Sequence, residues 1–174
     1  MELWDAYDAF GRRTGALLTR GEPVPPGCFH VVAEVAVRHA DGSLLVTRRD
    51  PRKPNFPGCW EIGAGGSVLA GESWQEGARR ELREETGLEA RALIPLFLAV
   101  RPENGGIYAG FLCQYDGSKD AVRLQEGETI GYRWLSPREL LACVERPDFT
   151  VSQRQRWRVF LHQLEKETEH VLLL

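Results

Sequence analysis

The sequence predicts a mixed α+β (α/β) fold in which one β-sheet lies between helices. Runs rich in β-branched and aromatic residues, bounded by glycine and proline, alternate with segments of helical periodicity. Their order along the chain is β-rich, helix, β-rich, helix, helix, which favours a mixed sheet covered by helices. The 174 residues are 43% hydrophobic and 27% charged, which suffices for one compact domain and excludes a disordered or fibrous chain.

The N-terminal half is predicted to consist of strands separated by turn residues. Residues 1–20 predict a small hairpin, and the proline- and glycine-rich residues 20–27 predict a linker into the main body. Residues 29–39 and 44–49 flank an Asp-Gly turn and predict a second hairpin. A proline-rich loop follows, and residues 59–66 predict one short strand that ends in glycines.

The C-terminal half is predicted to contain three helices and three strands. The first helix covers residues 74–86. The strands that follow cover residues 92–100, 106–115 and 130–136. A Ser-Pro-x-Glu capping box that begins at Ser136 opens the next helix. Residues 151–168 are expected to form one amphipathic helix, whose apolar side carries Trp157, Phe160, Leu161 and Leu164.

Charge and cysteine content exclude several classes of function. The net charge is −3, from 22 Lys+Arg against 25 Asp+Glu, which gives no sequence-wide reason to expect a nucleic acid or an anionic membrane as partner. The longest apolar runs are too short to span a bilayer, and the acidic N-terminus is unlike a signal peptide. The four cysteines are far apart, so neither a zinc site nor a redox dithiol is indicated. We therefore expect a cytoplasmic domain with reduced thiols.

Three acidic residues share one face of the helix predicted over 74–86. Glu81, Glu84 and Glu85 follow at i, i+3 and i+4, and at about 100° per residue they overlap the rim of the apolar arc. Like charges beside a core are unfavourable unless a cation neutralises them, and carboxylate oxygens suit Mg²⁺ or Mn²⁺ better than zinc. Gly77, in the same arc, leaves room for another segment or a ligand. Alternatively, neighbouring arginines offset the acids on a solvated helix face.

Residues 66–88, which contain this helix, resemble the Nudix box. That pattern is a glycine, five residues, a glutamate, seven residues, and then Arg-Glu-aliphatic-x-Glu-Glu-x-Gly-aliphatic. Its fixed positions are filled here by Gly66, Glu72, Arg80, Glu81, Leu82, Glu84, Glu85, Gly87 and Leu88. The resemblance implies an α/β/α sandwich with a mixed sheet. It also implies a Nudix domain over residues 28–174 that includes the C-terminal helix, with residues 1–27 as a hairpin extension and linker.

The resemblance also implies an activity and a cofactor. Nudix enzymes are hydrolases of a diphosphate linkage, typically in a nucleoside diphosphate joined to another group, in which water attacks phosphorus. The implied metal ligands for Mg²⁺ or Mn²⁺ are Glu81, Glu84, Glu85 and the backbone carbonyl of Gly65. Arg80 is expected to orient a box glutamate through a charge-assisted hydrogen bond, and Glu72 to support the loop or contact a metal-bound water.

The general base and the substrate pocket lie outside the box. Family members often use another acid shortly before a strand, and Glu126 is preferred here over Glu128, with a box glutamate as the alternative base. Pro102 lies near where ADP-ribose-cleaving members often carry a proline. The residues expected to contact the substrate are Phe56, Trp60, Arg101 and Tyr108.

Two other functions share this fold. The stretch from Phe56 to Ser73 is similar to isopentenyl diphosphate isomerase, but the positions of the isomerase's catalytic cysteine and metal-binding histidine hold Gly65 and Ser67. A ligand-sensing or protein-binding module without activity is the second alternative, and the intact box argues against it. The N-terminal hairpin is marginal by itself, so we expect it to cover the site or to pair with a second chain in a homodimer.

Overall fold

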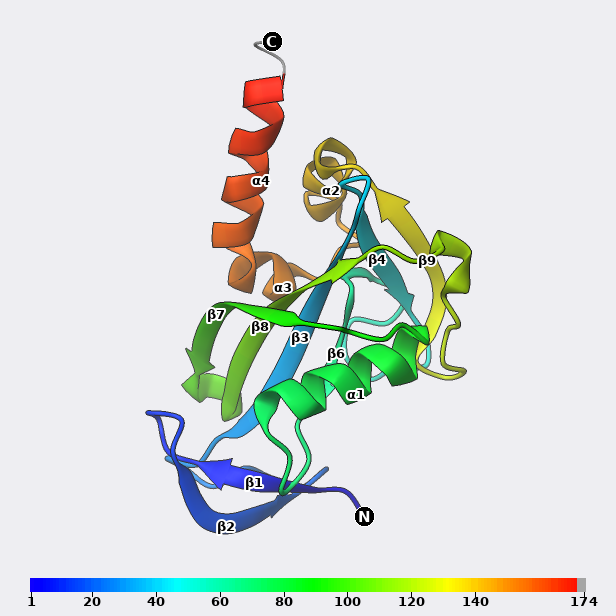
Figure 1. Ribbon diagram of the computed structural model, residues 1–174. Coiled ribbons are helices and arrows are strands. Elements are labelled where there is room, and N and C mark those ends of the chain that lie inside the picture. The colour runs from blue at the N-terminus through cyan, green and yellow to red at the C-terminus, as the bar shows by residue number, and fades with distance from the viewer. Residues whose placement is uncertain (172–174) are drawn as a thin grey trace.

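The computed structural model describes residues 1–171 (Figure 1). Its elements follow the predicted alternation of strands and helices, and the last three residues of the predicted domain, 172–174, lie outside the described part. The elements are β1 (Leu3–Tyr7), β2 (Arg13–Thr19), β3 (His30–His39), β4 (Leu44–Arg49), β5 (Trp60–Ile62), β6 (Ala64–Ser67), α1 (Trp74–Thr86), β7 (Leu93–Arg101), η1 (Pro102–Asn104), β8 (Gly106–Tyr115), η2 (Lys119–Ala121), β9 (Thr129–Leu135), α2 (Pro137–Val144), α3 (Val151–Arg156) and α4 (Arg158–Val171).

One mixed sheet forms the centre of the molecule. Its main path is β5-β4-β3-β8-β7, with β6 added to β3 and β9 added to β4. The strands β3 and β8 run parallel, from His30 opposite Gly106 to His39 opposite Tyr115, whereas the other pairs are antiparallel. The predicted mixed sheet is therefore confirmed.

Helices cover both faces of this sheet, as an α/β/α sandwich requires. On one face, Val35 of β3 packs in a buried cluster with Leu82 of α1. On the other face, Leu44 of β4 packs in a second cluster with Leu140 of α2 and Trp157. Since β3 contributes to both clusters, its near-continuous run of buried residues is explained by its central place. None of the helices in the described range is long and apolar enough to cross a bilayer.

A capping box and a glycine set the ends of α1. The Ser73 hydroxyl accepts a hydrogen bond from the Glu76 backbone N–H at 3.2 Å, and the Glu76 carboxylate accepts one from the Ser73 N–H at 2.7 Å. At the other end, Gly87 adopts a left-handed conformation with φ 70°, and its N–H donates to the Arg83 carbonyl. These caps fix which residues belong to the helix and therefore which side its acids occupy.

Two predicted elements are each divided in the structure. The single strand expected over residues 59–66 is two strands, because Gly63 turns the chain with φ 60° while pressed against the Val35 carbonyl. The single helix expected over 151–168 is α3 and α4, which are separated at Trp157. Trp157 is fully buried, and its indole N–H donates to Glu34 at 2.9 Å. The helix is interrupted at this residue, and the interruption places the indole ring in the core.

The N-terminal hairpin, β1 and β2, forms its own two-stranded sheet and docks on the domain. Tyr7 and Phe29 exchange backbone hydrogen bonds of 2.8 and 2.9 Å, and the Ala70 N–H donates to the Leu3 carbonyl. Trp4 and Leu18 are buried in a small cluster at this contact. Figure 1 shows the hairpin, in blue, beside the loop that leads into α1. The predicted hairpin is confirmed, and it lies against the start of α1, where Tyr7 contacts Trp74.

Candidate active site

A cavity of about 770 Å³ lies where α1, β3, β6 and the N-terminal hairpin meet. The three box carboxylates reach it from α1, and Gly65 and Gly66 reach it from β6. This volume is within the usual range for a small-molecule site. The helical spacing thus brings the acids to one cavity, and the inward-facing interpretation of the sequence holds for Glu85, which is buried.

Two glycines of β6 allow the acids to lie against the strand. A Cβ on Gly66 would lie 2.4 Å from the Cδ atom of Glu81. The Gly65 N–H donates to Glu85 Oε2 at 3.1 Å, and a Cβ at Gly65 would meet the Ala33 carbonyl oxygen at 2.6 Å. A side chain at either position would therefore move a carboxylate or the sheet backbone.

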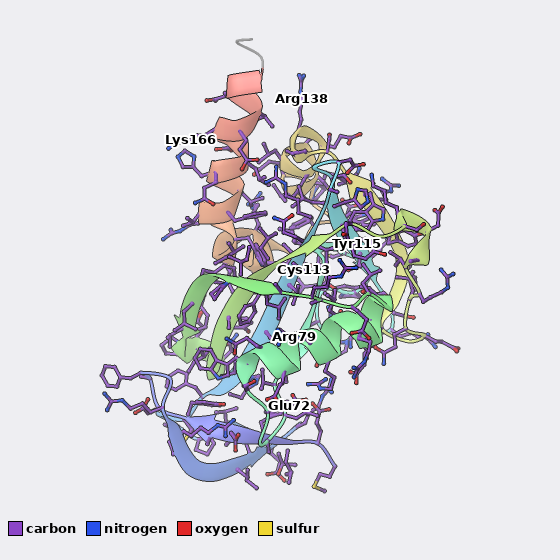
Figure 2. The ribbon with its side chains drawn as sticks, viewed as in Figure 1. Glu72, Arg79, Cys113, Tyr115, Arg138 and Lys166 are labelled. Atoms are coloured by element: carbon purple, nitrogen blue, oxygen red, sulfur yellow. The ribbon has the colours of Figure 1, made fainter. Side chains whose placement is uncertain are left out.

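Arg80 connects the loop before α1 to the acids. Its Nη1 donates to Glu81 at 2.7 Å and to Glu84 at 3.1 Å, and its Nε donates to Glu72 at 2.8 Å. Glu72 in turn accepts the Leu69 N–H at 2.9 Å. The hydrogen bond to Glu72 is the main reason why the pKa of Arg80 is raised above its ordinary value. Figure 2 shows Glu72 in the loop that leads into α1.

The cavity concentrates negative charge at Glu85. Burial, together with the charges of Glu61 and Glu81, raises the pKa of Glu85 well above its ordinary value. Burial also raises the pKa of Glu61 to about 7, although Arg49 lies 3.1 Å from this carboxylate and opposes the shift. Burial raises the pKa of Glu81 too. A cation bound between these acids would relieve this unfavourable concentration of charge.

The donor set fits a divalent oxygen-binding cation, although the side chains are engaged in ion pairs. Within residues 1–171, no three acidic, histidine or cysteine side chains are grouped closely enough to hold a metal ion as they stand. Arg80 holds Glu81 and Glu84, and Lys53 pairs with Glu128. The buried carboxylate of Glu85 accepts a hydrogen bond from one backbone N–H. Carboxylates facing a polar cavity are the ligands that Mg²⁺ and Mn²⁺ take.

Of the two acids considered as general base outside the box, the structure brings Glu128 and not Glu126 to the cavity. Glu126 is exposed and does not line the cavity, whereas Glu128 does and pairs with Lys53. The Asp50 N–H donates to the Glu128 carbonyl at 2.8 Å, which holds Glu128 at the start of β9 beside the site. Glu126 lies farther out in the same loop, so its side chain faces solvent.

The expected substrate residues divide into two groups. Phe56 and Tyr108 line the cavity, whereas Trp60 and Arg101 do not. Trp60 points into the core beneath α2 and α4, because side chains alternate along β5 and it is Glu61 that faces the cavity. Arg101 ends the edge strand β7 and lies 3.8 Å from Glu103. Side chains alternate between the two faces of a strand along residues 60–62. This alternation is the sequence signal that favours Glu61 over Trp60 as the residue facing the cavity.

The N-terminal hairpin contributes a wall of the cavity. Trp4 stacks on His30 with ring centroids 4.2 Å apart, and Arg20 donates to Glu2 at 2.6 Å. All four residues line the cavity. The structure thus supports the expectation that the hairpin covers the site, and pairing with a second chain stays a prediction.

Glu34 and Arg156, which the sequence does not predict as site residues, also line the cavity. Glu34 comes from the middle of β3, and Arg156 is the last residue of α3. Both side chains are buried and form an ion pair, with Arg156 Nε 3.1 Å from Glu34 Oε2. A glutamate inside an otherwise apolar strand was the available signal, because a buried carboxylate needs a partner.

Comparison with known proteins shows which family this chain belongs to. The NUDIX domain model matches residues 29–169. A Nudix hydrolase of Listeria monocytogenes, described as uncharacterized, is 39% identical over 51% of this chain and 52% of that protein. The match thus spans about half of that relative. An isopentenyl-diphosphate Delta-isomerase of Kocuria rhizophila is 31% identical over 71% of this chain and 72% of that protein.

A solved structure supports the same assignment. The crystal structure of DR0079 from Deinococcus radiodurans has a TM-score of 0.70 to this chain at 26% identity, over 86% of this chain and 92% of that chain. The mixed sheet between helices is thus shared with this solved structure. The chain belongs to the Nudix family. Its relatives include isomerases, in agreement with the similarity of residues 56–73 to isopentenyl diphosphate isomerase.

Proposed function

We propose that this chain is a divalent-metal-dependent phosphoanhydride hydrolase. Its substrate contains a diphosphate linkage, as in a nucleoside diphosphate joined to another group, and water attacks phosphorus. The observation that carries the proposal is the complete box, whose Glu81, Glu84 and Glu85 approach one cavity that is also lined by cationic side chains. That combination suits a substrate with several negative charges.

The box residues have two proposed roles, to bind the metal and to hold its ligands in position. Glu81, Glu84, Glu85 and the Gly65 carbonyl would hold Mg²⁺ or Mn²⁺, which offsets phosphate charge and acidifies the attacking water. Arg80 keeps Glu81 and Glu84 in place through its hydrogen bonds.

A proton acceptor and counter-charges complete this proposal. Glu128, rather than Glu126, is the proposed proton acceptor outside the box, with a box glutamate as the alternative. Lys53 and Arg49 offer positive charge near the cavity and are partnered by Glu128 and Glu61.

An isomerase is less well supported. Residue 65, where the isomerase carries its cysteine, is a glycine whose added Cβ would lie 2.6 Å from a backbone oxygen. This position accepts no side chain without a shift of the sheet. A sensor module remains the second alternative, and an activity assay separates it from a hydrolase.

The test is release of phosphate and of pyrophosphate with Mg²⁺ or Mn²⁺. The substrates are nucleoside triphosphates, ADP-ribose, NADH, dinucleoside polyphosphates and coenzyme A. We expect hydrolysis of one class, abolished by chelation and lowered about 100-fold or more by Glu85→Gln. This variant should stay folded, because the substitution removes a buried charge.

The control is Arg79→Gln, at an exposed position of the same helix, which should keep the wild-type rate (Figure 2). A wild-type rate in Glu85→Gln contradicts the metal assignment. Silence on all substrates, together with no binding of Mn²⁺, contradicts the hydrolase and favours the sensor module.

A further inference from the structure

The guanidinium of Arg156 is buried at the cavity wall with one nitrogen unused. Its side chain is 8% exposed. Nε and Nη2 both donate to the carboxylate of Glu34, which is itself buried. Among residues 1–171, no acceptor for Nη1 is found, and Arg156 lines the cavity. Nη1 therefore faces the cavity rather than a protein acceptor, and it is available to donate to a ligand there.

Two further residues hold this guanidinium in place. Its Cζ lies 4.0 Å from the centroid of the Tyr108 ring, so the flat cation rests on an aromatic face. The Asn104 side-chain N–H donates to the Tyr108 hydroxyl at 2.9 Å and fixes the ring. Arg156 is therefore held along one edge by Glu34 and on one face by Tyr108. Little conformational freedom is left for a ligand to remove on binding.

The pair lies next to the box carboxylates in the sheet. Glu34 is directly opposite Gly65 in the pairing of β3 with β6. The Gly65 N–H donates to Glu85. Since neighbouring strands lie about 4.8 Å apart, the anchor of Arg156 is one strand spacing from the anchor of Glu85. One compact anion with two charged groups spans that distance.

Docking of the C-terminal helices does not explain the whole arrangement. Trp157 already ties this segment to Glu34 through its indole N–H at 2.9 Å. Adding a buried ion pair gives little net stability, because both charges lose their hydration. The donor that remains at the cavity is what a planar guanidinium offers to phosphate oxygens.

We propose that Arg156, seated on Tyr108 and anchored by Glu34, forms a subsite for the second phosphoryl group of a diphosphate. The first phosphoryl group lies at the box carboxylates. This inference rests on the proposed hydrolase function and deepens it, because it names the residue outside the box that binds the second phosphoryl group. A phosphate monoester lacks the second group and gains nothing from Arg156.

The test compares two ligands by titration calorimetry in the presence of Mg²⁺. Methylenediphosphonate carries two phosphoryl groups that cannot be hydrolysed apart, and orthophosphate carries one. We expect Arg156→Gln to weaken methylenediphosphonate binding roughly 10- to 100-fold and orthophosphate binding less than about 2-fold. Arg156→Lys, which keeps the charge without the planar fork, should recover part of the loss.

The matched control is Arg154→Gln in the same helix. Arg154 does not line the cavity and pairs with Glu145 at 2.8 Å, so its loss should leave both affinities unchanged. Melting temperatures of all variants separate folding from binding. If Arg156→Gln does not fold, Tyr108→Leu, which leaves the Glu34 pair in place, should still weaken methylenediphosphonate selectively.

Three outcomes overturn the subsite. Equal weakening of both ligands indicates a general charge effect, and a lowered melting temperature with unchanged affinities indicates docking alone. No change in Arg156→Gln, while Glu85→Gln abolishes Mn²⁺ binding and hydrolysis, overturns the subsite and leaves the hydrolase intact. Full hydrolysis by Glu85→Gln, in contrast, overturns the proposed function itself.

Discussion

The first prediction concerns Gly66, because the carboxylate of Glu81 fills the space that a side chain at this position would need. In Gly66→Ala the new Cβ would lie 2.4 Å from Glu81, whose flexible side chain can move away. We expect the melting temperature to change by only a few degrees, and kcat/KM and Mn²⁺ affinity to fall about 10-fold or more, because Glu81 leaves its place. The control is Gly131→Ala in β9, where the nearest atom to the new Cβ is 3.8 Å away. Wild-type kcat/KM in Gly66→Ala would show that the position of Glu81 is not critical.

Individual site residues differ in how far the sequence predicts them. The positions of Glu81 and Glu85 on one helix face could be predicted, because an α-helix repeats every 3.6 residues and the sequence contains the residues that cap both ends of α1. Arg156 could not, because it points into the cavity only where the chain breaks at Trp157, and a single helix over 151–168 hides that break. Trp60 lies on the opposite face of β5 from the cavity, because a shift of one position along a strand reverses the face of the sheet.

The packing of α1 on its preceding loop gives a second prediction, at Gly77. Alanine there gains about 1 kcal/mol of helix propensity, but its Cβ would lie 2.8 Å from Val68 and 3.2 Å from Glu72. Because this contact is buried, we expect Gly77→Ala to lower the free energy of unfolding by about 1–2 kcal/mol, measured by denaturant titration. Gln75→Ala, on the exposed side of α1, should be neutral or slightly stabilising. A stabilised Gly77→Ala would contradict close helix–loop packing as the role of this glycine.

Existence and type of most elements could be predicted, but not their neighbours in the sheet. The hairpins and the capped helices follow from local signals such as turn residues and capping boxes. The parallel pairing of β3 with β8 joins residues 76 positions apart, such as His30 and Gly106, and no local pattern specifies it. The same holds for the hairpin β1–β2, whose place over the site depends on tertiary contacts of Tyr7 and Trp4.

The whole cavity is an arrangement of charges that the protein does not balance with fixed ion pairs alone. Lys53, Arg49 and Arg156 each hold one glutamate of the cavity, and Arg80 holds more than one. Glu85 has no such partner among the described residues, and burial raises its pKa well above the ordinary value. The ion-free protein therefore contains an electrostatic penalty that a bound cation removes, and this couples cofactor, pH and stability.

That coupling gives the last prediction, which concerns the pH dependence of stability without metal. The pKa of Glu61 is raised from 4.5 to about 7 and that of Glu85 is raised as well, so the folded state holds more protons than the unfolded state between these values. Stability is then fully present below about pH 4.5 and falls as pH rises toward 7. His30, whose pKa is lowered by burial, opposes this trend. Melting temperatures in EDTA should fall from pH 5 to 7.5, and Glu85→Gln should flatten the slope. Mg²⁺ should raise the melting temperature more at pH 7.5 than at pH 5, because protons compete with the metal. An equal slope in the wild type and Glu85→Gln would show that the Glu85 carboxyl group is not what links pH to stability.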